Sequence, residues 1–291
     1  MKKIFRVKLA MVVVALCSTL VIAQPGYRQG DAFHGPVKTV RIERTSIRVV
    51  GDSENESPPV LIQEIVYSRD GLSREIRVYN ADGSIRQKTI ETYRADGSRA
   101  KTHVIDGSDK TISTHTFERD QSGRLVSETR HNGDGSVKDR KFVEWDSAGP
   151  SINSTRRIAG DGRQLETSVV EIDSTAKTSN WRTSNADGSR TEQIASRDSA
   201  GNHRNEVRSY APDGTLTGRS ISIVDTGVTR KEATLYDGAG NVKLKTLETR
   251  EYDHRHNLIK SVNYRWNNEL QKFQPSVANY ARITYFDTTE R

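Results

Sequence analysis

Asn80-Ala81-Asp82-Gly83-Ser84 is the stretch of sequence that decides the fold, because close copies of it return at residues 94–98, 133–136, 185–189 and 212–215. Asp-Gly favours a tight turn between antiparallel strands. Glycine accepts a positive φ, and the aspartate side chain accepts hydrogen bonds from nearby backbone amides. We therefore expect a β-hairpin at each of these places.

A second turn type, Asp-x-x-Gly, lies between these copies, at residues 120–123, 146–149, 198–201 and 237–240. The two types mostly alternate. Counted together, the turn glycines stand at positions 71, 83, 97, 123, 135, 149, 162, 188, 201, 214, 227 and 240, in steps of 12 to 14 with two double steps of 26. Degenerate turns at residues 106–109 and 173–175 fill the double steps. A register kept for this long indicates a tandem repeat.

The segments between the turns have the character of strands. A period near thirteen leaves about eight residues for each strand, on the order of 27 Å in length. Thr, Val, Ile and aromatic residues are frequent there, and Val137, Val143 and Trp145 share one face of their segment. The sequence predicts an all-β protein, a tandem antiparallel β-hairpin meander of about 15 strands in one twisted and curled sheet. Closure of that sheet into a barrel is left open.

The first 23 residues have the pattern of a secretory signal peptide. Four basic residues open it: Lys2, Lys3, Arg6 and Lys8. An apolar run of 15 residues then ends at Ala23, shorter than the roughly 20 that a membrane-spanning helix needs. We expect cleavage after it, no stable transmembrane helix afterwards, and a periplasmic or secreted protein. Cys17 is the one cysteine of the chain, so the mature part can form no disulfide or thiolate site.

Composition divides the rest of the chain into three parts. Residues 24–64 hold opening strands and an acidic loop, residues 65–250 hold the hairpin repeats, and residues 251–291 are rich in aromatic side chains. We expect the last part to be a cap, because a repeat array needs a terminal unit that covers its exposed edge.

The charge of the chain argues against nucleic acid as a partner. The formal net charge is +7, of which four belong to the basic residues of the signal, so residues 24–291 carry +3. Basic and acidic side chains alternate along this part, and no polycationic tract is present that would follow a phosphate backbone. We expect a protein or a glycan of the cell envelope as the partner, while the oligomeric state is open.

The repeats resemble the YD-repeat, or RHS-repeat, family, whose units carry Tyr-Asp-x-x-Gly followed by a small or basic residue and a hydrophobic one. The motif Tyr236-Asp237-Gly238-Ala239-Gly240-Asn241-Val242 matches in full. Residues 145–149 match with Trp145 in place of tyrosine, and residues 252–258 match with His256 in place of glycine. The resemblance covers about residues 65–266. It implies a small, divergent, stand-alone relative of proteins whose repeats form curled β-sheet shells or mediate surface contacts.

Catalytic and metal-binding motifs are missing from the sequence. No Gly-x-Ser-x-Gly, His-Glu-x-x-His or phosphate-binding loop occurs, and of the seven histidines only His254 and His256 form a pair. Each turn offers one aspartate, and neighbouring turns at one sheet edge are roughly 10 Å apart, too far to share a calcium ion. We expect no catalytic site, no metal and no cofactor. A pocket that contains a serine or aspartate hydrogen-bonded to one of the histidines would revive a hydrolase.

Aromatic side chains before the turns are the remaining candidates for a ligand site. We single out four of them as a platform for sugar rings: Trp145, Trp181, Tyr210 and Tyr236. The alternative is that they are core residues that hold a thin sheet together. The expected function is a non-enzymatic interaction or binding module of the envelope or secreted fraction. Two alternatives are an envelope assembly component that pairs through its sheet edges, and carbohydrate binding through an aromatic face.

Overall fold

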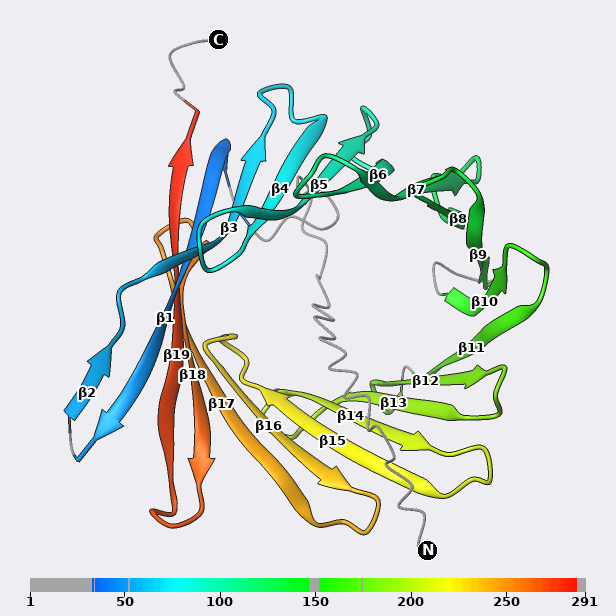
Figure 1. Cartoon of the computed structure of the whole chain (residues 1–291). Coiled ribbons are helices and arrows are strands. Elements are labelled where there is room, and N and C mark those ends of the chain that lie inside the picture. Colours follow the sequence, from blue (N-terminus) through cyan, green and yellow to red (C-terminus); the bar gives the residue numbers. More distant parts are fainter. Residues whose placement is uncertain (1–32, 34, 52, 147–151, 174, 287–291) are drawn as a thin grey trace, which may run out of the picture.

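The computed structural model describes residues 33, 35–51, 53–146, 152–173 and 175–286, which form one antiparallel sheet of 19 strands (Figure 1). The predicted signal at residues 1–23 lies outside the described residues. The strands are β1 (Val37–Val50), β2 (Ser53–Glu56), β3 (Val60–Tyr67), β4 (Ser73–Tyr79), β5 (Ile85–Tyr93), β6 (Arg99–Asp106), β7 (Thr111–Arg119), β8 (Leu125–Asn132), β9 (Val137–Trp145), β10 (Ile152–Ala159), β11 (Gln164–Asp173), β12 (Thr178–Asn185), β13 (Arg190–Arg197), β14 (His203–Tyr210), β15 (Leu216–Val224), β16 (Arg230–Asp237), β17 (Val242–Tyr252), β18 (Leu258–Asn267) and β19 (Lys272–Tyr285).

The sheet closes on itself, which corrects the expected open, curled sheet. β1 pairs along one side with β3 and along the other with β19, so the first long strand joins the last (Figure 1). β2 pairs with β1 alone and stands outside the ring, which leaves 18 strands in the barrel. The predicted count of about 15 is also too low. The ladder of turn glycines counts only the strands from β3 to β17. The turn before β18 has His256 in the glycine position, and β1, β2 and β19 lie beyond the ladder.

Both turn types of the sequence form the same turn. In the Asp-Gly type the Gly83 amide donates to the Asn80 carbonyl, and in the Asp-x-x-Gly type the Gly123 amide donates to the Asp120 carbonyl. Gly83 has φ +83° and Gly123 has φ +78°, the left-handed region that glycine enters without a Cβ clash. The aspartate carboxylate accepts backbone amides in both, which confirms the predicted role of these residues. Only the position of the aspartate within the turn differs.

Two turns keep this geometry with another residue in the glycine position, whereas the predicted turns at 146–149 and 173–175 include residues outside the described part of the chain. Asp109 has φ +65° and His256 has φ +60°, and the His256 amide donates to the Asp253 carbonyl as a turn glycine would. Gly227 is an exception to the predicted ladder, because the left-handed position of its turn is held by Val228 at φ +58°. A β-branched residue in this region is strained.

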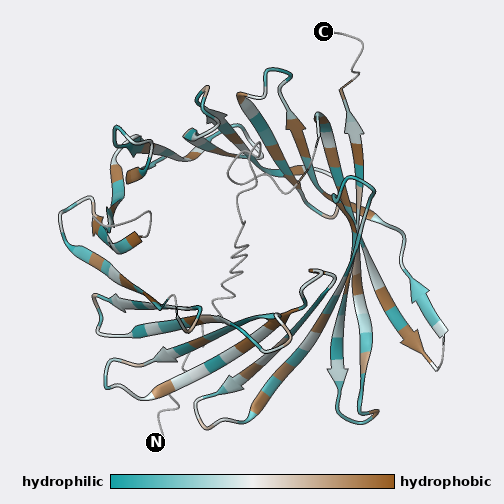
Figure 2. Cartoon of the chain, turned by 180° about the vertical axis from the view of Figure 1, so that it is seen from behind, coloured by the Kyte–Doolittle hydropathy of each residue, from teal (hydrophilic) through white to brown (hydrophobic). Residues whose placement is uncertain are grey.

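The apolar core is concentrated at the seam where the ring closes. Val37, Val40 and Ile65 are buried there, and seven partly buried side chains pack against them: Phe33, Ile42, Tyr67, Ile76, Ala281, Ile283 and Tyr285. Elsewhere hydrophobic and hydrophilic residues alternate along the strands all round the ring (Figure 2). Backbone pairing and polar cross-strand contacts therefore support most of the wall. Within the described residues, no helix has the length and apolar character needed to cross a bilayer.

Candidate functional site

The two faces of the sheet differ, and cross-strand pairing assigns each side chain to one of them. Side chains alternate along a strand, and direct cross-strand partners lie on the same face. We call the face that carries Val40 and Ile65 face A, and the face that carries Glu206 and Tyr210 face B.

The four predicted aromatic residues are not brought together. Trp145 and Trp181 lie on face A, separated by the two strands β10 and β11. Tyr210 and Tyr236 lie on face B, on β14 and β16. The structure therefore forms no single platform from the four, and each pair has to be considered with its own neighbours.

Cationic side chains lie against the faces of these aromatic rings. The guanidinium carbon of Arg124 is 5.7 Å from the Trp145 ring centroid, and that of Arg190 is 4.1 Å from the Tyr210 ring. The same contact recurs between Arg219 and Tyr236 at 5.6 Å. Such cation–π pairs between neighbouring strands help to hold a thin sheet together. They also occupy one face of each of these three rings.

The arginines of face B form the most concentrated charge in the second half of the barrel. Five of them stand on four neighbouring strands, β12 to β15, and we call them the arginine cluster: Arg182, Arg190, Arg204, Arg208 and Arg219. Two carboxylates, Glu192 and Glu206, lie among them on the same face, which leaves the cluster with a formal charge of +3. These strands occupy one continuous part of the wall in Figure 1.

Glu206 is the centre of the cluster. Its side chain is 7% exposed and accepts hydrogen bonds from three arginines, at 2.8 Å from Arg208 Nε, 2.8 Å from Arg219 Nε and 2.7 Å from Arg204. The hydrogen bond from Arg219, reinforced by those from Arg204 and Arg208, lowers the pKa of Glu206 to about 2. The carboxylate is therefore ionised at any physiological pH and holds three guanidinium groups in place.

Arg208 and Arg219 are direct cross-strand partners, and like charges placed opposite each other repel. Glu206 offsets that repulsion, but each of the two arginines uses one N–H on it out of the five that a guanidinium carries. Both side chains are more than a third exposed, at 39% for Arg208 and 36% for Arg219. The two guanidinium groups can bind a carboxylate or phosphate group by donating paired hydrogen bonds to its oxygens.

Glu192 supports the other side of the cluster. Its carboxylate lies 3.7 Å from Arg182 Nε and 3.6 Å from Arg190 Nε, and it accepts a hydrogen bond of 3.1 Å from the Tyr210 hydroxyl. Arg182 is half exposed, at 51%. The tyrosine ring, the carboxylate and the two guanidinium groups thus form one connected polar surface.

The net charge along the chain does not reveal the arginine cluster, because acidic residues lie between the arginines in the sequence. The signal was the spacing of Arg204, Glu206 and Arg208, since alternate residues of a strand project to one face. Charges that look interleaved in the sequence become segregated when each strand sorts them by face.

A second charged network lies on face A of the first half, with a different character. Asp139 is 3% exposed and receives both Nε and an amino group of Arg130 at 2.7 Å, a bidentate pair. Glu91 is held by Arg74 at 2.6 Å and by Arg99 at 3.3 Å. These carboxylates are matched closely by cations, and the Arg74 side chain is only 10% exposed.

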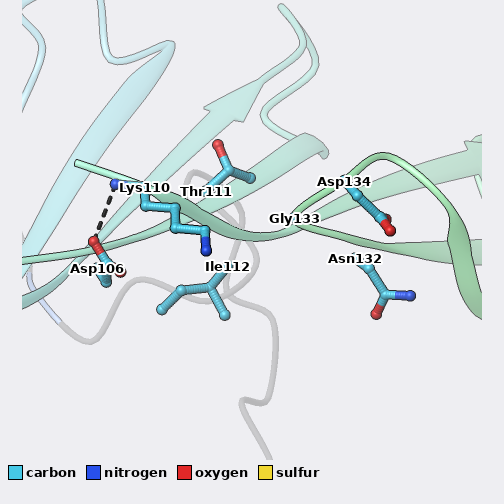
Figure 3. Close-up of a pocket in the computed structure, with 7 residues that line it drawn as sticks. All are labelled: Asp106, Lys110, Thr111, Ile112, Asn132, Gly133 and Asp134. Atoms are coloured by element: carbon cyan, nitrogen blue, oxygen red, sulfur yellow. Dashed lines mark hydrogen bonds between the residues drawn. The ribbon is translucent and has the colours of Figure 1, made fainter. Parts of the chain in front are cut away.

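The turns offer no metal site among the described residues, where no group of three or more His, Cys, Asp or Glu side chains converges. An open cavity of about 500 Å³ lies between the turns that follow β6 and β8. Figure 3 shows Asp106 and Asp134 at opposite sides of it, not converging. Asp106 accepts the backbone amide of Lys110 in its own turn. The paired His254 and His256 belong to the turn between β17 and β18.

Comparisons with known proteins give distant likenesses only. No protein-family model and no curated protein matches the chain. Among solved structures, a porin-like protein from Bacteroides uniformis is 9% identical with a TM-score of 0.38, over 86% of this chain and 99% of that one. A porin-like protein from Bacteroides vulgatus is 8% identical, over 86% and 98%, with a TM-score of 0.33. TcdB2-TccC3 is 13% identical with a TM-score of 0.32, over 82% of this chain and 16% of that one. All three TM-scores are too low to carry a functional argument.

Proposed function

We propose that this chain is an exported binding module whose ligand is an acidic glycan, held at the arginine cluster on face B of β12–β15. The observation that carries the proposal is the direct cross-strand pair of Arg208 and Arg219, which share Glu206. Two exposed cations placed face to face are unfavourable for the isolated sheet, and an anionic ligand relieves that cost.

Two tyrosines favour a glycan over a simple anion. Tyr236 is the direct cross-strand partner of Arg219, and Tyr210 is two residues from Arg208 on the same strand and face. A uronic acid carries both groups that such a surface recognises, a carboxylate for the guanidinium and an apolar C–H face for an aromatic ring. This retains the predicted roles of Tyr210 and Tyr236 and assigns none to the tryptophans of face A.

The distribution of charge favours a polymer with widely spaced carboxylates. One cross-strand row carries Arg182, then Glu192, then the direct pair Arg208 and Arg219, so Glu192 separates Arg182 from the pair by two strand spacings, roughly 10 Å. A polyanion with a charge on every unit of its backbone would meet Glu192 as well as the arginines. A glycan whose acidic sugars alternate with neutral ones avoids that repulsion.

Closure of the barrel leaves the edge-pairing alternative with little support. Every strand of the ring has a partner on both sides, and the short β2 is the one strand of the described chain that pairs on a single side. Assembly through a sheet edge needs an unpaired strand of useful length.

The test is a titration of the purified protein with hyaluronan oligosaccharides of four to ten sugars, in which glucuronate alternates with a neutral sugar. The double variant R208Q/R219Q is expected to weaken binding at least tenfold, because it removes the pair that faces the carboxylate. The matched control is R41Q/R282Q. It also removes two exposed arginines of face B that are direct cross-strand partners, but these two contact different carboxylates, Glu64 for Arg41 and Glu43 for Arg282.

Equal losses in the two double variants would mean that only net charge matters, and the proposed site would be wrong. Neutral dextran is the ligand control. Tighter binding of a single-stranded oligonucleotide of matched length than of hyaluronan would replace the glycan by nucleic acid as the ligand of the cluster.

A further inference from the structure

A serine, a histidine and a glutamate lie in line on face A, outside the arginine cluster. The ring nitrogen Nδ1 of His115 is 2.9 Å from Glu128 Oε1, and its other nitrogen, Nε2, is 3.5 Å from the hydroxyl of Ser113. Ser113 and His115 are alternate residues of β7, so both project from the same face, and Glu128 stands on the neighbouring strand β8. The serine–histidine contact is one part of what a hydrolase of this kind needs, and a neighbouring space for substrate is the other.

The hydrogen bonds assign the roles of the three groups. A glutamate oxygen accepts from Nδ1–H, so the lone pair of the neutral imidazole is on Nε2, which faces the serine hydroxyl. The hydrogen bond from His115 holds the pKa of Glu128 below its usual value, which keeps the carboxylate ionised as a partner for the ring. A nucleophile, a base and an orienting carboxylate in this order have the geometry of nucleophilic catalysis. The 3.5 Å between Ser113 and His115 is long for a hydrogen bond, as is common at such sites when no substrate is bound.

An open cavity and a hydroxyl group lie beside the direct cross-strand partners of these residues. Asn132, the direct cross-strand partner of Ser113, lines the open cavity of about 500 Å³ shown in Figure 3. Thr102, the direct partner of His115, is 7% exposed and has a buried hydroxyl with no hydrogen-bond partner. The cavity is open to solvent and its lining combines the apolar Ile112 with polar and charged residues, which suits a short acyl chain rather than a fatty one.

We infer that Ser113, His115 and Glu128 form an esterase site for short-chain acyl esters, an activity separate from glycan binding. Ser113 Oγ attacks the ester carbonyl carbon while its proton passes to His115 Nε2. The bond from that carbon to the alcohol oxygen breaks, and the alcohol leaves with the proton from Nε2. Water then attacks the acyl-serine and gives its proton to Nε2. Ser113 Oγ leaves and recovers that proton, so one ester and one water become one acid and one alcohol.

The experiment combines turnover of p-nitrophenyl acetate with covalent labelling by a fluorophosphonate. In the wild-type protein we expect saturable hydrolysis and a label that peptide mass spectrometry places on Ser113. S113A and H115Q are expected to lose at least 100-fold in kcat/KM, whereas S220A, which removes a face A serine of β15 that lies opposite Val207 and Leu235, is expected to change it less than twofold. Hyaluronan binding is expected to be unchanged in all of these variants.

Glu128 acts through His115, so it is a positioning residue. E128Q is expected to lower kcat about tenfold with little change in KM and to alter the pH profile of kcat, which a merely structural role would not do. An unlabelled wild-type protein without turnover would overturn the inference, and so would a label on another residue or full activity in S113A. Because labelling is read on the wild-type chain, the test does not depend on the folding of a variant.

Discussion

The two charged networks of the barrel contain the same residue types but differ in burial and in the role we assign to them. On face A of the first half, Asp139 and Glu91 are buried, each is held by two arginines, and the Arg130 and Arg157 side chains around Asp139 are 28% and 27% exposed. On face B of β12–β15, the five arginines are 36% to 51% exposed and outnumber their carboxylates. The two networks differ in exposure: a more buried network stabilises the wall, whereas exposed arginines are available to a ligand.

The largest effect is expected from D139A, which breaks the face A network. Removal of this carboxylate leaves the partly buried Arg130 and Arg157 without their shared partner, so the free energy of unfolding is expected to fall by about 3 kcal/mol. Hyaluronan affinity is expected to be unchanged where the variant is folded. Denaturant titration and binding on the same samples check both. A loss below about 1 kcal/mol would contradict the structural role given to this network.

E206Q is expected to act mainly on the response to acid. The pKa of Glu206 in the folded state, about 2, lies below its ordinary value of 4.5. Its stabilising contribution is therefore complete above pH 4.5 and is lost as the pH falls toward 2. The exposed arginines around it reduce the effect to on the order of 1 kcal/mol. Denaturation of the wild type and E206Q at pH 7 and pH 3 measures it. An unchanged difference between the two pH values in E206Q would refute the assignment.

Turn substitutions next to the cluster should change stability without changing charge. V228G relieves a β-branched residue at φ +58° and is expected to stabilise the fold by about 0.5 to 1 kcal/mol. G214A, in the turn between the strands of Arg208 and Arg219, places a Cβ at φ +85° and is expected to cost about 1 kcal/mol. Thermal unfolding gives the sign of each. If hyaluronan affinity changed together with stability in these variants, the claim that the turns affect stability and not ligand binding would be wrong.

The smallest effect on binding is expected from W181A. This ring lies on face A, opposite the arginine cluster, so hyaluronan affinity is expected to change less than twofold while Y210A weakens it. Titration of both variants beside the wild type checks this. A larger loss in W181A than in Y210A would place the ligand on face A and invert the comparison.

The repeat and its turns were predictable because the relevant physics is local. An aspartate and a glycine at fixed spacing specify a turn within five residues, and even His256 holds the position that the ladder assigns to glycine. The closure of the ring was not predictable in this way. It depends on the pairing of β1 with β19. These two strands are not joined by a hairpin turn, and neither contains a copy of the repeat.

The candidate sites were hidden for a different reason. A difference of one residue in a turn or strand moves every following side chain to the other face, so Trp181 and Tyr210 occupy opposite faces although both were chosen as aromatics before turns. Likewise, Ser113 and Glu128 are brought together only by the register of β7 against β8. The sequence shows which residue types are present. The face of the sheet and the cross-strand row of each residue follow only from the pairing of the strands.

The pairing of β1 with β19 also determines when the barrel can close during synthesis of the chain. Thr39 and Thr284 meet across 245 residues of chain, whereas most other neighbours in the ring are successive hairpin strands. Hairpins close short loops and can form while the chain is still emerging, but the ring is sealed only after the last strand has arrived. Until the ring closes, the strand at each edge of the sheet has no partner on its outer side. A second copy of the chain in the same open state can supply that partner. Strand exchange between nascent molecules therefore competes with closure, and a chain that lost β19 would stay open to it permanently.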